Sequence, residues 1–212
     1  MTRPGLRAFG ATVEMIPSEG GRVTPALFDR FKARIAELAA EPNTFWTDQF
    51  NNRDALEGYR NIGVELAEQV GHIDLFCGAV GSGGMLMGVA QALRAAGSRA
   101  RVVALEPASA PILTAGHGGP HRVEGTAPGF VPPHLVLGLH GEARAIEEDE
   151  ARETARRLAR EEGIFAGTSS GLNVAAALRY AAELGRGHVV ATVACDSGLK
   201  YLNGDLFLEP RP

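Results

Sequence analysis

The sequence predicts an α/β fold with a mostly parallel sheet. Three nearly continuous apolar runs, at 73–80, 101–107 and 188–194, are typical of strands in a sheet that is covered on both faces. Segments with the apolar spacing of helices alternate with these runs, and such alternation is the pattern of parallel sheets. Residues 12–16 form a shorter run and are a fourth strand candidate.

Five segments space their apolar residues as helices that bury one face do. They cover residues 25–40, 54–70, 83–96, 149–162 and 170–184. In 149–162, Ala151, Ala155 and Leu158 fall on one face. Gly163 follows that segment, where a glycine commonly ends a helix. Helices are therefore expected between the successive strands of the sheet.

Residues 107–142 interrupt the alternation because they are rich in glycine, proline and histidine. A connection of that length in a compact domain is often functional. Its histidines do not have the spacing of metal ligands, so we expect solvated side chains at His117, His121, His134 and His140. The sequence therefore predicts no metal site.

Composition narrows the class of protein further. The chain has 212 residues, of which 45% are hydrophobic, so it can build a substantial core. Its net charge is -4 and no basic stripe is present, which argues against nucleic acid as a partner. No apolar run has transmembrane length, and the first ten residues lack the core of a signal peptide. Cys77 and Cys195 belong to no metal motif, so we expect a reducing cytoplasm.

A glycine-rich loop follows the apolar run 73–80 and leads into the predicted helix 83–96. Glycines let backbone N–H groups approach an anion, and a helix N-terminus adds partial positive charge, so a phosphate group suits this loop. The dinucleotide fingerprint GxGxxG is excluded because Leu86 occupies its third glycine position. The Walker motif is excluded because no Lys-Ser/Thr pair follows. A tight turn that binds no ligand is the alternative.

Five motifs in a fixed order resemble one enzyme family. They are "GAVGSGGMLMGVAQAL", "VVALEPASAPIL", "EGTAPGFVP", "EEDEARETARRLAREEGIFAGTSSGLNVAAAL" and "DSGLKYLNGDLF". Together they resemble the fold-type-II pyridoxal 5'-phosphate (PLP) enzymes of the cysteine synthase and cystathionine β-synthase family, from about residue 5 to residue 208. The resemblance implies a three-layer sandwich, the large domain of the tryptophan synthase β-like fold. Residues 1–45 would be the remnant of a truncated small domain, and residues 46–212 the large PLP-binding domain without its N-terminal elements.

The resemblance implies that the glycine loop binds the PLP phosphate. The residues concerned are Gly81, Ser82, Gly83, Gly84 and Met85. Met85 stands where the family usually has a threonine that also bonds the phosphate. Ser197 would share a hydrogen bond with the pyridine nitrogen, which suits β-elimination and β-replacement. The alternative for Ser197 is a hydroxyl that caps a turn.

Two further residues are implied to lie near the amino-acid substrate. Gln49 falls where the family has a glutamine near the substrate carboxylate, and a polar residue at an element junction is the equal alternative. Gly125 opens a loop that would lie beside the bound amino acid. In "GTSSG", Ser169 and Ser170 are expected to cap a helix rather than to act in catalysis.

No catalytic residue is assigned, because the family's Schiff-base lysine is expected in a segment that precedes these residues. The sequence has two lysines, Lys32 and Lys200, and neither suits that role. The implied function is β-replacement or β-elimination in cysteine biosynthesis, with O-acetylserine or serine plus sulfide or a thiol. This chain would be inactive alone, and would form a homodimer or associate with a missing N-terminal part. The alternative is a non-catalytic remnant or phosphate-binding module that needs a partner chain.

Overall fold

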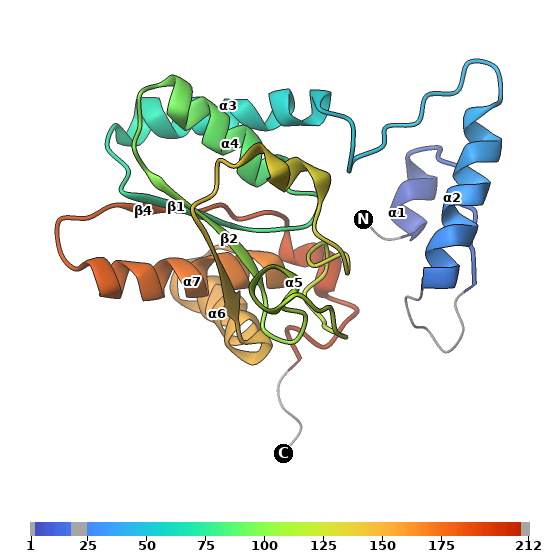
Figure 1. Ribbon diagram of the computed structural model, residues 1–212. Helices are drawn as coiled ribbons and strands as arrows, with labels where there is room; N and C mark the ends of the chain where they lie inside the picture. Colours follow the sequence, from blue (N-terminus) through green and yellow to red (C-terminus); the bar gives the residue numbers. More distant parts are fainter. Residues whose placement is uncertain (1–2, 18–24, 209–212) are drawn as a thin grey trace. The chain divides into compact units, whose positions relative to one another are not determined.

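The computed structural model describes residues 3–17 and 25–208 and divides the chain into two compact units, Met1–Asp48 and Gln49–Pro212 (Figure 1). The first unit contains α1 (Arg3–Ala8) and α2 (Pro25–Ala39). The strand expected at 12–16 is wrong, because these residues are irregular and pair with no strand in the described ranges. A strand exists only where a neighbour completes its hydrogen bonds.

The second unit contains a parallel sheet, as predicted. In its described part the strands β1 (Leu75–Ala79), β2 (Arg101–Pro107), β3 (Glu142–Ile146) and β4 (Val190–Ala191) lie in the order β3-β2-β1-β4. Every pairing between neighbouring strands is parallel. All four strands therefore end at the same edge of the sheet, where ligands bind in folds of this class.

Helices cover both faces of this sheet, which confirms the predicted three-layer α/β architecture (Figure 1). On one face α3 (Asp54–Val70) and α4 (Gly84–Ala95) pack together, and on the other α6 (Glu148–Glu161) and α7 (Thr168–Leu184) do so. Successive strand residues enter opposite cores: Phe76 packs beneath α3 and α4, whereas Cys77 packs toward α7. Apolar runs in the sequence are the consequence of this two-sided burial.

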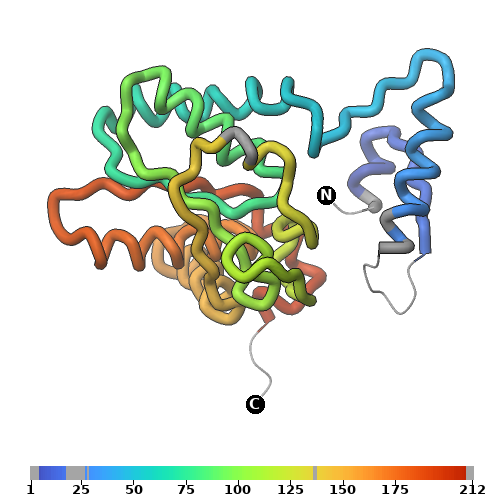
Figure 2. Tube along the Cα trace, in the orientation of Figure 1, coloured from blue at the N-terminus to red at the C-terminus, as the bar shows by residue number. Residues whose placement is uncertain are grey.

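The irregular stretch after β2 contains more structure than the sequence predicts. It includes the short helix α5 (Ile112–Ala115) and the 3-10 helix η2 (Pro133–Leu137), and Figure 2 shows its winding path. It then leads directly into β3, a strand that the sequence analysis missed. The last 3-10 helix, η3 (Gly198–Tyr201), follows β4. Among the described residues, no helix is long and apolar enough to cross a membrane.

Asn173 joins α7 to two segments at the sheet. It is completely buried, its Oδ1 accepts a hydrogen bond from the Ala79 N–H at 2.7 Å, and its Nδ2 donates to the Val193 carbonyl at 2.9 Å. A buried backbone group without a partner is costly, so this one side chain satisfies two groups that the strand ladders leave open. Asn173 thereby fixes the end of β1, from which the glycine loop departs.

Replacing Asn173 by alanine should lower the free energy of unfolding by about 2–4 kcal/mol, because the Ala79 N–H and the Val193 carbonyl both lose their partner. Urea denaturation of the purified chain measures this change. Leu178→Ala is the matched control on the same helix, since Leu178 is 53% exposed. Equal losses in the two variants would contradict the role given to Asn173.

Asp74 holds together the starts of β1 and β4. Its Oδ2 accepts a hydrogen bond from the Val189 N–H at 2.7 Å, and its Oδ1 lies 3.0 Å from His72 Nε2 and 3.2 Å from His188 Nδ1. Hydrogen bonds lower the pKa of Asp74 to about 2. The Val189 N–H has the largest effect, and the imidazoles of His72 and His188 have smaller ones. The charged carboxylate is therefore the form that the folded chain stabilises.

This depressed pKa makes the contribution of Asp74 to stability dependent on pH. The contribution is fully present above the unfolded pKa of about 4 and is lost as pH falls toward the folded pKa of about 2. Asp74→Asn should therefore melt below the wild-type chain at pH 6, and the two melting temperatures should converge between pH 4 and pH 2. A difference that stays constant down to pH 2 would contradict this assignment.

Candidate functional site

The glycine loop lies at the carboxyl end of β1, between that strand and the first turn of α4. Gly83 has a φ of 82°, a left-handed conformation that glycine adopts without strain, and α4 begins at the next residue. His134 packs against this turn, because a Cβ atom placed on Gly83 would lie only 3.4 Å from the Cβ of His134. The backbone of the loop is thus fixed at the N-terminus of a buried helix.

The first N–H groups of α4 lie at the carboxyl end of β1. A helix leaves its first N–H groups without partners inside the helix. One of them is satisfied within the loop, because Ser82 Oγ accepts from the Gly84 N–H at 3.3 Å. The N–H groups of Gly83, Met85 and Leu86 have no acceptor in the described part of the chain. They are the donors that a phosphate group would use.

The side chain of Met85 points away from these donors. A Cβ on Gly78 of β1 would lie 2.8 Å from Met85 Cε, and Met85 packs against the core between the sheet and α4. Met85 can therefore offer an anion its backbone N–H but no side-chain hydrogen bond. The family's threonine contact is absent from this position, and the backbone donors remain.

The loop that carries Gly125 lies directly against the glycine loop. A Cβ on Gly81 would overlap the carbonyl oxygen of Gly125, so only glycine fits between the two backbones. The Ala127 N–H donates to the Val80 carbonyl at 2.9 Å, which fixes the loop to the end of β1. The two sequence motifs that hold Gly81 and Gly125 therefore meet in space.

His134 connects the glycine loop to Gln49. Its ring Nε2 lies 3.0 Å from the Gln49 carbonyl oxygen, and its Cβ faces Gly83. The expectation of a solvated His134 is wrong, because the side chain is only 3% exposed. The backbone of Gln49 thus lies beside the glycine loop within the second unit. His134 is the residue of this site that the sequence analysis missed.

Ser197 precedes η3 and is exposed. Its Oγ accepts a hydrogen bond from the Leu199 N–H at 3.3 Å, so the hydroxyl caps this turn, and its own hydrogen stays available to a ligand. A backbone bridge pairs Ser197 with Ala166, next to the start of α7. Capping and ligand binding are therefore compatible at this residue.

A polar network lies between the Gly125 loop and the Ser197 turn. Thr168 donates to Glu124 at 2.8 Å, and Tyr201 Oη donates to Asp196 Oδ2 at 2.9 Å. Burial, and then the hydrogen bond to Asp196, raises the pKa of Tyr201, so this phenol stays protonated. Lys200 Nζ forms an ion pair with Asp196 at 3.0 Å. The ammonium group of Lys200 is therefore already paired with a carboxylate of the same turn.

The serines of "GTSSG" do not cap α7. The helix begins at Thr168, and Gly167 at its N-cap has no side-chain hydrogen bond. Both serines are buried, and Ser170 Oγ accepts from the Cys195 N–H at 2.9 Å. The expected capping role is wrong because these serines are inside the first turn, where Ser170 joins α7 to the segment before Ser197. No group of side chains that could hold a metal ion occurs among the described residues.

Comparison with known proteins decides the family. A family model described as "Pyridoxal-phosphate dependent enzyme" matches residues 2–196. The chain belongs to this family. Its members depend on pyridoxal phosphate, so the cofactor predicted from the sequence motifs is confirmed for the family. The predicted membership among fold-type-II PLP enzymes is confirmed as well.

Named relatives of this family are similar over nearly the whole chain. A cysteine synthase of Staphylococcus aureus is 36% identical over 205 residues, which are 95% of this chain and 64% of that protein. An O-ureido-L-serine synthase of Streptomyces lavendulae is 37% identical over 95% of this chain and 61% of its own length. The structure of a hydrogen sulfide-producing enzyme from Fusobacterium nucleatum matches with a TM-score of 0.84, at 28% identity, over 100% of this chain and 65% of that one. The chain thus spans less than two thirds of the length of these relatives.

The residues present fit the phosphate group of the cofactor. Three N–H groups without an acceptor among the described residues, a left-handed Gly83 and a close backbone approach at Gly81 form a backbone cradle at the start of α4. A dianion at this place also gains from the helix dipole of α4.

Replacing Gly81 by alanine should push the Gly125 loop away from β1 and lower the free energy of unfolding by about 1–3 kcal/mol. Thermal unfolding of the purified chain measures the loss. Gly58→Ala on α3 is the control, because no atom lies within 4 Å of a Cβ there and the added methyl favours a helix. If the Gly81 variant melted at the wild-type temperature, the two loops would not be in contact.

Proposed function

We propose that residues 46–212 form the PLP-binding domain of an enzyme for β-replacement or β-elimination on an amino acid. Residues 1–45 would belong to its smaller domain. The observation that carries this proposal is the glycine loop: its free N–H groups lie at the carboxyl end of β1, against Gly125 and beside Gln49. The names of the relatives support cysteine synthesis as the reaction type, and O-acetylserine stands in the names of two structural relatives. We propose O-acetylserine or serine, with sulfide or a thiol, as the substrates.

The chain's own residues would act by binding and orienting. The N–H groups of the loop, with the hydroxyl of Ser82, would hold the phosphate, and the hydroxyl of Ser197 would face the pyridine nitrogen. Bound PLP supplies an electron sink for the α-carbon of the amino acid. A neutral hydroxyl at the ring nitrogen keeps that sink weaker than a carboxylate would, which favours loss and replacement of a β-substituent. Gln49 and Gly125 would line the place of the amino acid.

The amine that bonds to PLP would come from outside these 212 residues. Lys200 forms an ion pair with Asp196 in the turn after Ser197, and Lys32 lies on α2 in the first unit. The chain by itself would then bind the cofactor without making cysteine. It would act as a homodimer or together with the part of the fold that its longer relatives have in addition.

A second candidate function is a non-catalytic phosphate-binding module that works with a partner chain. The observation that favours it is Met85, whose side chain packs into the core and gives the phosphate no hydrogen bond. Such a module would bind inorganic phosphate and PLP with similar affinity, because it would recognise only the shared group. The enzyme domain should prefer PLP, since Ser197 would add a contact to the ring.

The test is the affinity of the chain for PLP, measured by equilibrium dialysis with ³¹P NMR of the bound phosphate. Ser82→Asp should weaken binding about tenfold or more, because it places a negative charge beside the phosphate. The control is Asn61→Asp, which adds the same charge at an exposed position of α3. Ser82 accepts the Gly84 N–H at 3.3 Å, and an aspartate can accept the same bond. Equal affinities in the two variants would place the phosphate elsewhere.

Treatment of the PLP complex with borohydride, followed by peptide mass mapping, tests the origin of the amine. No adduct is expected on Lys32 or Lys200, and no cysteine should form from O-acetylserine and sulfide. An adduct on either lysine, together with cysteine formation, would show that these 212 residues are catalytic by themselves.

A further inference from the structure

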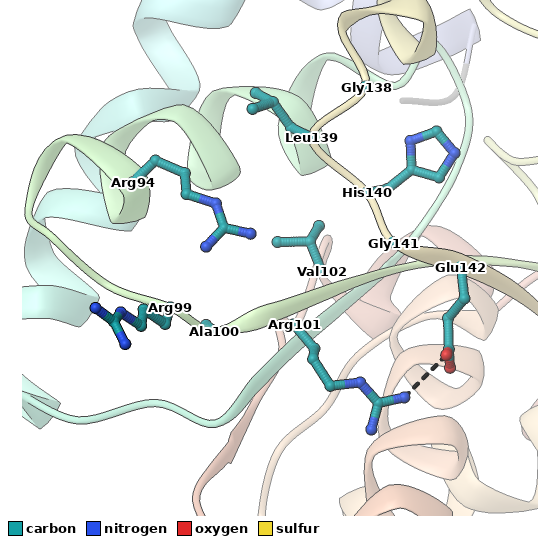
Figure 3. A pocket seen from close by; sticks show the side chains of 10 residues that line it. All are labelled: Arg94, Arg99, Ala100, Arg101, Val102, Gly138, Leu139, His140, Gly141 and Glu142. Carbon is teal, nitrogen blue, oxygen red and sulfur yellow. Dashed lines mark hydrogen bonds and ion pairs between the residues drawn. The ribbon is translucent and has the colours of Figure 1, made fainter.

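A cavity lies at the edge of the sheet opposite to the glycine loop. Its volume is about 280 Å³, and Figure 3 shows the side chains that line it. It is bounded by the first residues of β2 and β3, by the last turn of α4 and by the segment 138–141 that leads into β3. Because the strands are parallel, their first residues lie at the edge away from the glycine loop. The cavity is therefore separate from the site described above.

Three arginines line this cavity, and their charges are only partly neutralised. Arg101 forms an ion pair with Glu142 at 2.8 Å, and Glu142 also accepts a hydrogen bond from Tyr180. Arg94 donates to the Ser98 carbonyl at 3.2 Å, which leaves its charge without a counterion. Arg94 and Arg99 form no ion pair in the described part of the chain. Two positive charges thus remain beside one cavity.

The nearby carboxylates do not neutralise the charges of Arg94 and Arg99. Glu142 is the one acidic residue in the lining, and Arg101 already neutralises it. Arg99 also lines a neighbouring hollow together with Glu68 and His72. Glu68 forms no ion pair with Arg99 among the described residues. A small anion entering the cavity would therefore meet excess positive charge.

The floor of the cavity is apolar. Ala100 and Val102 at the start of β2 are almost completely buried, and Leu139 lies opposite on the segment before β3. Figure 3 shows the side chain of Arg94 reaching from α4 toward Val102, beneath Leu139. Nδ1 of His140, also in the lining, is buried and has no hydrogen-bond partner in the described ranges. Cations at the rim above an apolar floor suit a ligand with an anionic head and a short apolar body.

We propose that this cavity is a second ligand site, which binds a small organic anion. In Figure 3 the guanidinium group of Arg94 reaches into the cavity and that of Arg99 turns outward, so the carboxylate or phosphate head would bind Arg94, and Arg99 would turn toward it from the rim. The apolar part of the ligand would cover Val102 and Leu139. A guanidinium group matches both kinds of oxyanion, because its N–H donors form a fixed fork. The site does not depend on the function proposed for the glycine loop.

The experiment titrates the full chain with inorganic phosphate and, separately, with butyrate, at constant ionic strength in chloride. Calorimetry gives the affinity, and the Ser82→Asp background weakens any phosphate binding at the glycine loop by about tenfold, as expected above. The double variant Arg94→Gln with Arg99→Gln should bind the preferred anion about tenfold more weakly or worse. Arg94 and Arg99 are exposed, so the double variant should keep the fold, and circular dichroism checks this.

The control removes the same net charge elsewhere. Arg7 and Arg186 are exposed and form no ion pair with a described residue, so Arg7→Gln with Arg186→Gln should leave the affinity within about twofold of the parent chain. Tighter binding of butyrate than of phosphate would identify a carboxylate with an apolar body, and binding of phosphate alone would identify a phosphate head. Absence of binding by both probes, or equal losses in the two double variants, would overturn the proposal.

Discussion

The close approach of two backbones, at Gly81 and Gly125, determines where the parts of the candidate site lie. Because a Cβ on Gly81 would overlap the Gly125 carbonyl, the Gly125 loop lies on the end of β1. Glu124 then accepts a hydrogen bond from Thr168 at the start of α7, and Ala166, two residues before that helix, forms a backbone bridge with Ser197. Segments more than a hundred residues apart are thus brought to one edge of the sheet by a contact that requires glycine.

The fold was predictable where local pattern and tertiary burial agree. The helix expected at 54–70 is found at Asp54–Val70, since Leu56, Ile62 and Leu66 pack into the core that α3 shares with α4. Strand β3 was missed because "EARAI" alternates polar and apolar residues and lies at the sheet edge, where no continuous apolar run is needed. Residues 12–16 have a strand-like composition, but composition alone cannot supply a neighbouring strand.

The site was predictable only as far as it is contiguous in the chain. The loop from Gly81 to Met85 combines strand end, glycines and helix start in one short segment, so its likeness to a phosphate cradle is visible in the sequence. His134 lies in a stretch full of loop residues and resembles a solvated histidine. Its burial arises from Gly83 and from the Gln49 carbonyl, which are distant in sequence. Such a role depends on packing between segments, and residue type gives no signal for it.

Helix α4 runs between the two proposed anion sites, and its dipole acts on them in opposite ways. At its N-terminus the free N–H groups attract an anion by themselves. At its C-terminus the dipole is negative, so Arg94 in the last turn is stabilised by the helix and by the Ser98 carbonyl without any ligand. Arg99 lies beyond the helix and has no such compensation. Neither guanidinium group has a carboxylate partner in the described part of the chain, and an anion in the adjoining cavity would supply one to both.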